Sequence, residues 1–250
     1  MGLNLLTTAK ELFLELLFPV RCAACGKETG GKRKNKLICT ICLKTLSPSL
    51  NFSCPLCEAK TADGRLCFSC NLIISNTANS FYLDRLLSPF SYKGRAIQKI
   101  IKAFKYRFIK NLEIPLGRLM TGYLEKIKDR IDLNGLTIVP VPLHKRKFNQ
   151  RGYNQSELIA DKISKYLTAD MVGDCLLKTR PTKDQARLKE NERPENLKNV
   201  FVCSKPWLVS GKRMMLIDDV YTTGATMKEC AKVLKEAGAK EVIGLAIARG

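Results

Sequence analysis

Histidine is almost absent from this chain, in which His144 is the only one among 250 residues. A serine nucleophile is commonly activated by a histidine that acts as its general base. No serine in this sequence stands in a nucleophile motif either. We therefore expect no hydrolase that works through a histidine-based triad.

Long apolar runs are also missing, so the sequence predicts no transmembrane segment. Residues 1–20 predict an amphipathic helix that ends at Pro19, in which Lys10, Glu11 and Glu15 interrupt the leucines. This segment has neither a basic start nor a small-residue cleavage site, which argues against a signal peptide. We expect a cytoplasmic protein, and peripheral contact of the helix with the inner face of the membrane stays open as an alternative.

Acidic residues are scarce, with 23 Asp and Glu against 43 Lys and Arg, so the formal net charge is +20. Such an excess of positive charge suits a polyanionic ligand or partner, of which nucleic acid is one candidate. Basic side chains also cover solvated faces of many proteins, so the charge alone does not decide between these interpretations.

Cysteine, in contrast, is abundant in the first third of the chain. Eight of the eleven cysteines form four Cys-x-x-Cys pairs. These pairs are Cys22/Cys25, Cys39/Cys42, Cys54/Cys57 and Cys67/Cys70. A Cys-x-x-Cys turn places two thiolates where a tetrahedral Zn²⁺ can bind both, so four turns predict two structural Cys₄ zinc sites.

The spacing leaves the pairing of these four turns open. Sequential pairing joins the first two turns and the last two, whereas an interleaved arrangement alternates them. Disulfides are disfavoured because no signal peptide is expected, and an iron–sulfur cluster is a further alternative. Residues 21–72 are too few for a core of their own, so zinc would supply on the order of 10 kcal/mol of folding energy per site.

The stretch from residue 214 to 226 carries the strongest functional pattern. Its sequence is Met-Met-Leu-Ile-Asp-Asp-Val-Tyr-Thr-Thr-Gly-Ala-Thr. It predicts a buried strand that ends at two carboxylates, a turn rich in hydroxyl groups, and the start of an amphipathic helix. The main-chain N–H groups of such a turn and the positive end of the helix dipole favour a bound phosphate.

Two acids beside a phosphate would repel it unless the ligand also brings a diol or a divalent cation. A ribose 5-phosphate that bears pyrophosphate and Mg²⁺ meets all of these demands. The pattern resembles the signature of type I phosphoribosyltransferases. That resemblance implies that Asp218 and Asp219 are the catalytic acids and face the ribose. It also implies that the turn binds the 5-phosphate through Thr222, Thr223, Gly224, Ala225 and Thr226. The simpler alternative is a buried strand whose threonines only cap the next helix.

Two further segments supply cations. Residues 136–143 predict a strand that ends in a stiff turn at Pro140 and Pro142, followed by a basic loop from His144 to Gly152. By the same resemblance this loop binds pyrophosphate. The available cations are Lys145, Arg146, Lys147 and Arg151. Arg151 is the best candidate because a guanidinium binds phosphate oxygens in pairs.

A helix is expected over residues 95–108, with Ile97, Ile100, Ile101, Phe104 and Phe108 on its buried face. Its opposite face is cationic, with Lys105 at the margin, and is either solvated or part of the rim of a ligand cleft. Residues 179–198 are polar and interrupted by prolines, which is typical of a lid or of a plain surface loop.

Taken together, these motifs resemble the competence protein F (ComF) family. The resemblance rests on the cysteine pairs, on Val-Pro-Val-Pro-Leu-His at 139–144, on Arg-Gly-Tyr-Asn-Gln at 151–155, on a spaced pattern from Gln185 to Phe201, and on the 217–226 stretch. It implies an α/β fold: a type I phosphoribosyltransferase-like core with a mostly parallel sheet flanked by helices, plus a small N-terminal double zinc ribbon. The expected domains are residues 1–20, 21–75 and 76–250.

The resemblance further implies a role in natural transformation, with single-stranded DNA and other competence proteins as partners. Three hypotheses follow. The first is a DNA-associated protein that binds phosphoribosyl pyrophosphate with Mg²⁺. The second is an active phosphoribosyltransferase, and the third is a regulatory or scaffold protein that senses such a ligand. The first is favoured and the second is the runner-up.

Overall fold

The computed structural model describes residues 19–29, 37–77, 80–182 and 199–250. The helix predicted over residues 1–20 and most of the lid predicted over residues 179–198 lie outside these ranges. Residues 32–36, whose sequence is Lys-Arg-Lys-Asn-Lys, lie outside them too.

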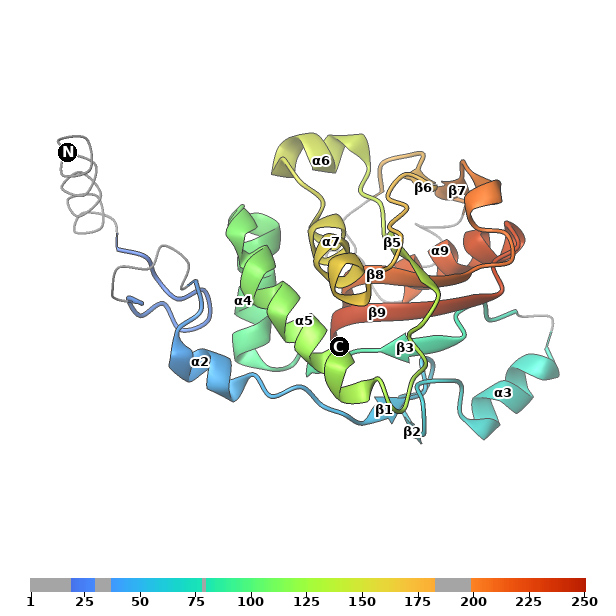
Figure 1. The fold of residues 1–250 in the computed structure, drawn as a ribbon, viewed down its shortest axis with the longest axis horizontal. Coiled ribbons are helices and arrows are strands. Elements are labelled where there is room, and N and C mark those ends of the chain that lie inside the picture. Colours follow the sequence, from blue (N-terminus) through green and yellow to red (C-terminus); the bar gives the residue numbers. More distant parts are fainter. Residues whose placement is uncertain (1–18, 30–36, 78–79, 183–198) are drawn as a thin grey trace.

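A parallel five-stranded sheet forms the centre of the molecule (Figure 1). Its order is β3 (Arg85–Leu87), β9 (Glu241–Arg249), β8 (Arg213–Tyr221) and β5 (Leu136–Pro140), and β4 (Phe90–Ser91) also pairs with β9. Every pairing within this sheet is parallel. The predicted α/β fold with a mostly parallel sheet is therefore confirmed.

Alternating residues of β8 divide the core between the two faces of the sheet. Met215 and Ile217 belong to one apolar cluster, with residues of α4 (Arg95–Tyr106), α5 (Glu113–Ile127) and α7 (Gln155–Leu167). Met214 and Leu216 belong to the other, with residues of α9 (Ala225–Glu236), β6 (Leu176–Lys178) and β7 (Phe201–Cys203). Successive side chains of a strand point to opposite faces, so a strand covered on both faces needs a continuous apolar run, as residues 214–217 provide.

Two local predictions are wrong. The segment from His144 to Gly152 is not a loop, because it contains helix α6 (Lys145–Arg151). His144 Nδ1 caps this helix by accepting from the backbone N of Arg146 at 3.2 Å, and Gly152 ends it in the left-handed region at φ 76°. Phe108 is not buried but 52% exposed, because α4 already ends at Tyr106 and Phe108 has a φ of 56°.

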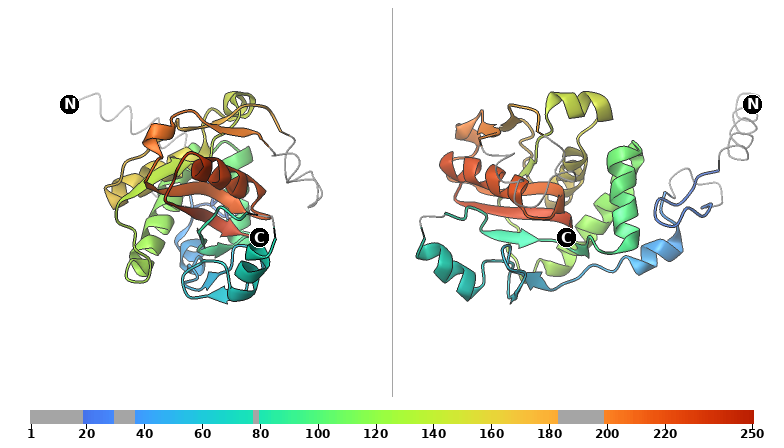
Figure 2. Two further views of the ribbon diagram at one scale, coloured as in Figure 1. Left: turned by 90° about the vertical axis from the view of Figure 1, so that its right-hand side faces the viewer. Right: turned by 180° about the vertical axis from the view of Figure 1, so that it is seen from behind.

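The cysteine-rich module consists of two halves that lie apart along one side of the molecule (Figures 1 and 2). The first half contains α2 (Thr40–Thr45). The second contains β1 (Phe52–Ser53), β2 (Lys60–Thr61) and α3 (Phe68–Ser75). The second half is joined to β3, where the backbone N of Leu86 donates to the carbonyl of Gly64 at 2.9 Å.

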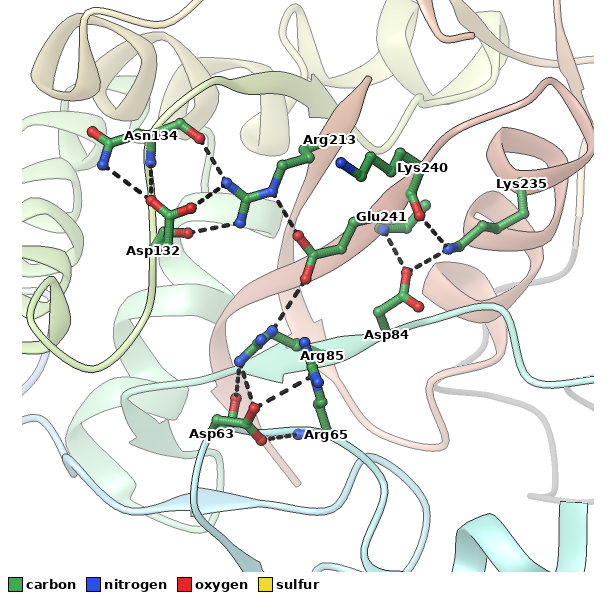
Figure 3. A network of polar contacts seen from close by, with 11 residues as sticks. Asp63, Arg65, Asp84, Arg85, Asp132, Asn134, Arg213, Lys235, Lys240 and Glu241 are labelled. Atoms are coloured by element: carbon green, nitrogen blue, oxygen red, sulfur yellow. Dashed lines mark hydrogen bonds and ion pairs between the residues drawn. The ribbon is translucent and has the colours of Figure 1, made fainter. Parts of the chain in front are cut away.

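A chain of ion pairs crosses the amino ends of the strands (Figure 3). Glu241 at the start of β9 accepts from Arg213 Nε of β8 at 2.7 Å and from Arg85 Nε of β3 at 3.2 Å. Arg85 in turn contacts Asp63 of the second half of the module at 2.7 Å, and Arg213 contacts Asp132 at 2.7 Å. Burial alone would raise the pKa of Glu241, but the two arginines outweigh it and lower that pKa.

Within the described residues, the remaining helical elements are two short 3₁₀ helices, Lys110–Leu112 and Pro206–Leu208. None of the helices in the described ranges is both long and apolar enough to cross a bilayer.

Candidate functional site

A cleft of about 300 Å³ opens at the carboxyl ends of β5 and β8. Residues from α4, α6, α7, β8 and the start of α9 surround it. Its lining comprises Tyr92, Lys105, Tyr106, Val141, Pro142, Leu143, Lys147, Arg151, Gln155, Ser156, Lys178, Thr182, Asp218, Asp219, Val220, Thr222 and Thr226. Ligands of open α/β sheets bind outside the carboxyl ends of the strands, which is where this cleft lies.

Both predicted acids face the cleft, and each has a different partner. Asp219 Oδ1 forms an ion pair with Lys105 Nζ at 2.7 Å, and only 9% of the Asp219 side chain is exposed. Asp218 Oδ1 accepts from Ser156 Oγ at 3.2 Å and from the backbone N of Asp219 at 2.8 Å. The acids are therefore held by one ammonium, one hydroxyl and one backbone amide.

The two carboxyl groups of Asp218 and Asp219 share a single lysine, Lys105, so the charges of these three residues are not balanced. Burial, followed by repulsion from Asp219, raises the pKa of Asp218 to about 7, although Lys105 opposes this shift. Burial would lower the pKa of Lys105, but the attraction of Asp219 and Asp218 outweighs it and raises that pKa. The site thus keeps a partly buried carboxyl whose charge a cation or a hydroxyl donor would stabilise.

The turn at residues 222–226, called the threonine turn below, leads from β8 into α9. Gly224 occupies the left-handed region at φ 73° and precedes the first residue of the helix. Thr222 and Thr226 line the cleft, and Thr223, Gly224 and Ala225 lie between them at the helix start. The backbone N of Ala225 donates to Thr223 Oγ1 at 3.4 Å, and Lys228 Nζ donates to the carbonyl of Thr223 at 2.8 Å.

The predicted cations separate into two groups. Lys105, Lys147 and Arg151 line the cleft. Arg151 donates to Gln155 Oε1 at 3.0 Å, and its guanidinium lies 5.4 Å from the ring centroid of Tyr106. Lys145 and Arg146 are exposed on α6 and are not among the residues that line the cleft.

Sequence reasoning missed several residues of the cleft: Tyr92, Tyr106, Ser156 and Lys178. A signal existed for Ser156, because it follows directly on the Arg-Gly-Tyr-Asn-Gln motif at 151–155. Asn154 caps α7 there by accepting from the backbone N of Ser156 at 3.1 Å, which aims Ser156 at the sheet. Tyr92 and Tyr106 gave no such signal, because lone aromatic residues near element ends are common.

The eight paired cysteines gather in two groups of four. Cys22, Cys25, Cys39 and Cys42 form one group, and Cys54, Cys57, Cys67 and Cys70 form the other, with the sulfur atoms of each group within 4.8 Å of one another. Cys25 and Cys39 Sγ lie 3.9 Å apart, and Cys57 and Cys67 Sγ lie 3.5 Å apart. Four thiolates around one Zn²⁺ at about 2.3 Å need this spacing, so both groups fit zinc, and the pairing is sequential.

Comparison with known proteins matches both parts of the chain. The family model described as "Double zinc ribbon domain" matches residues 13–71. The model described as "Phosphoribosyl transferase domain" matches residues 154–249.

Three curated relatives are similar to this chain in sequence. The DNA utilization protein YhgH of Escherichia coli is 37% identical over 131 residues, which cover 52% of this chain and 53% of that protein. Competence protein F of Haemophilus influenzae is 35% identical, over 60% of this chain and 66% of that protein. Competence protein ComFC of Bacillus subtilis is 24% identical, over 82% and 81%. The match to the first of these spans about half of that relative's length.

Proposed function

We infer that this chain binds phosphoribosyl pyrophosphate in the cleft above β8. The chain belongs to the competence protein F family and carries a double zinc ribbon and a phosphoribosyltransferase domain. We further propose that it acts in the uptake of DNA, in line with the names of its relatives. The relatives named for DNA utilization and for competence support this second part.

One observation carries the ligand proposal. The acids Asp218 and Asp219, the start of α9 and the side chains of Lys147 and Arg151 line one cleft. A plain phosphate would gain nothing from the acids, and a plain sugar would gain nothing from the cations. A ribose that bears phosphates at both ends uses both sets of groups.

The residues divide the ligand between them. The main-chain N–H groups and hydroxyls of the threonine turn hold the 5-phosphate, while Asp218 and Asp219 accept hydrogen bonds from the ribose hydroxyls. Arg151 and Lys147 neutralise part of the negative charge of the pyrophosphate. Bound Mg²⁺ would contribute two further positive charges. The Lys105–Asp219 ion pair screens the acids from the incoming phosphates, because it removes one of their two negative charges.

Calorimetric titration with phosphoribosyl pyrophosphate and Mg²⁺ tests this proposal. We expect binding by the wild type and a loss of affinity in the double variant Asp218→Asn, Asp219→Asn. Lys147→Ala and Lys145→Ala form a matched pair on α6, because only Lys147 lines the cleft. Lys147→Ala should weaken binding and Lys145→Ala should not. Equal affinity in the wild type and the double-asparagine variant contradicts the proposal.

The DNA part of the proposal rests on the surface beside the cleft. Residues 95–110 and 145–151 are rich in lysine and arginine. Tyr106 and Phe148 stand among them with 51% and 43% of their surface exposed. Cations that track a backbone and aromatic rings on which bases stack are typical of single-strand binding surfaces.

Fluorescence anisotropy with single-stranded DNA tests this part. Phosphate contacts release counterions, so affinity should fall steeply between about 50 and 200 mM salt. Phe148→Ala should weaken binding without changing the salt slope, because it removes a stacking surface and no charge. Affinity that does not change with salt contradicts the proposed phosphate contacts. Repeating the titration of phosphoribosyl pyrophosphate with DNA present shows whether the two ligands influence each other.

An active phosphoribosyltransferase is the second candidate. Tyr92 and Tyr106 line the same cleft as the acids, and their rings offer a surface for a planar acceptor. Release of pyrophosphate in the presence of an acceptor is the test. If no pyrophosphate appears with any acceptor although the donor binds, this candidate is wrong.

A further inference from the structure

One side chain, Tyr221, connects the second cysteine group to the threonine turn. Tyr221, the last residue of β8, precedes Thr222 and is only 2% exposed. Its hydroxyl donates to the carbonyl of Pro55 at 2.8 Å, and Pro55 lies between the zinc ligands Cys54 and Cys57. The turn and the metal site are therefore separated by one side chain.

Tyr221 also fixes the backbone of the turn. A Cβ atom added at Gly224 would lie 2.2 Å from the Tyr221 ring, so the ring packs directly against the glycine. The backbone N of Gly250 donates to the carbonyl of Tyr221 at 3.0 Å, which holds the other side of this residue. The ring leaves Gly224 little room to change its conformation.

Arg249 provides a second connection from the same end of the sheet. It pairs with Tyr221 in the β8–β9 register, and its guanidinium lies 5.4 Å from the centroid of the Tyr221 ring. Arg249 Nη1 donates to Ser53 Oγ and to the carbonyl of Cys54, both at 2.9 Å. Its Nε lies 3.3 Å from a carboxylate oxygen of Glu58. Three residues around the second Cys₄ site are thus held by one side chain of the sheet.

The first Cys₄ site is built differently. Hydrogen bonds around it join its own residues: the backbone N of Cys39 donates to Cys22 Sγ at 3.3 Å, and that of Ala23 donates to the carbonyl of Leu37 at 2.8 Å. Cys22, Ala23 and Ala24 belong to the apolar cluster on the α4–α5 face of the sheet. This site is packed against the core on the face away from α9.

We propose that the second Cys₄ site is the support of the threonine turn, and that Tyr221 and Arg249 are the positioning residues that connect the two. Metal binding fixes the main chain of residues 54–57, and with it the carbonyl groups that Tyr221 and Arg249 use. Without the metal these groups lose their place, the buried Tyr221 hydroxyl loses its partner, and the turn no longer presents its N–H groups in one arrangement.

This coupling deepens the proposed function, because it makes ligand affinity depend on the second Cys₄ site and not on the first. Its first test needs no ligand. Hydrogen exchange at residues 222–228 is compared in the wild type, Cys57→Ser and Cys25→Ser, which each remove one exposed ligand of one site. We expect exchange in the turn to rise at least about tenfold in Cys57→Ser and to stay within about twofold in Cys25→Ser. Equal exchange in the turn for both variants overturns the proposal.

The second test keeps both metals in place. Tyr221→Phe removes the hydroxyl that reaches Pro55, and Tyr123→Phe is its matched control, because the buried Tyr123 hydroxyl has no hydrogen-bond partner among the described residues. We expect Tyr221→Phe to raise exchange in the turn and to weaken binding of phosphoribosyl pyrophosphate with Mg²⁺ about tenfold. The control should change neither.

The two readouts separate the two ideas. If the wild type never binds phosphoribosyl pyrophosphate but the turn loosens in Cys57→Ser and Tyr221→Phe, the support stands and the proposed ligand is wrong. If the wild type binds the ligand and both variants match it in affinity and in exchange, the support is wrong and the ligand stands.

Discussion

The two ends of the sheet hold charges in opposite ways. At the amino ends, Glu241 lies between Arg85 and Arg213, and these arginines lower its pKa. At the carboxyl ends, Asp218 is partly buried beside a second acid, and its pKa rises to about 7. One end has a cation on each side of its central acid, and the other has two acids for one lysine.

The difference shows which end serves stability and which end serves binding. A buried carboxylate with two guanidinium partners stabilises the folded state. A buried carboxylate that lacks a full partner destabilises it and persists where a ligand supplies what is missing. The predictions below test this division, starting with the largest expected effect.

Glu241→Gln should lower the free energy of unfolding by about 3 kcal/mol, because it leaves two largely buried arginines without their shared acid. Affinity for phosphoribosyl pyrophosphate should stay within twofold of the wild type. Urea denaturation and calorimetry measure the two quantities. A parallel loss of affinity would show that the amino end also shapes the cleft.

Asp218→Asn should do the reverse. Asparagine keeps an oxygen for Ser156 and removes the partly buried charge, so stability at about pH 8 should be equal to or greater than that of the wild type. Ligand affinity should fall about 100-fold, which corresponds to about 2.7 kcal/mol. The same two measurements apply, and a variant that is less stable yet binds normally refutes the division.

The pH dependence of stability should reflect both acids. The pKa of Asp218 in the folded state lies above its ordinary value of 3.8, so the folded state binds more protons between about pH 4 and 7 and loses stability as the pH rises through that window. Glu241 acts oppositely: its lowered pKa stabilises the fold above its ordinary value of 4.5, and this contribution is lost as the pH falls. The free energy of unfolding, measured by denaturation at several pH values from 4 to 8, should therefore be higher in Asp218→Asn than in the wild type. The difference should be largest near pH 8. Curves that run parallel would mean that Asp218 does not titrate in this range.

Asp63→Asn should have the smallest effect, a loss of about 1 kcal/mol, because its ion pair with Arg85 is partly exposed. The neighbouring Arg65→Ala should change little, since 58% of that side chain is exposed. Thermal melting measures both. A loss as large as that of Glu241→Gln would place the centre of the network in the cysteine-rich module instead of in the sheet.

Local patterns in the sequence predicted most of the fold. A continuous apolar run that ends in two acids indicated β8, and the glycine-containing turn after it indicated the start of α9. The cysteine spacing indicated two metal sites but fitted both pairings, because each Cys-x-x-Cys turn offers the same two ligands. Helix α6 was missed because its seven residues carry no apolar periodicity and none is buried.

The contacts that define the site could not be predicted in the same way. Lys105 could be placed on a helix face, but its ion pair with Asp219 depends on how α4 packs against the end of β8. The hydrogen bond from Tyr221 to Pro55 joins residues 166 positions apart, and neither residue type suggests the other. Interactions of this kind are set by the packing of whole elements, and a single sequence carries no local signal of them.

The contact between Gly64 and Leu86 has a consequence for self-association. The edge strands of an open sheet can recruit a strand from a neighbouring molecule. At one edge the carbonyl of Gly64 already takes the N–H of Leu86 in β3. At the other, Pro140 in β5 has no N–H to offer, and Ile138 exchanges hydrogen bonds with the backbone of Asp170 and Val172. Stripping the metal from the cysteine-rich module should therefore uncover the β3 edge, so that aggregation accompanies demetallation.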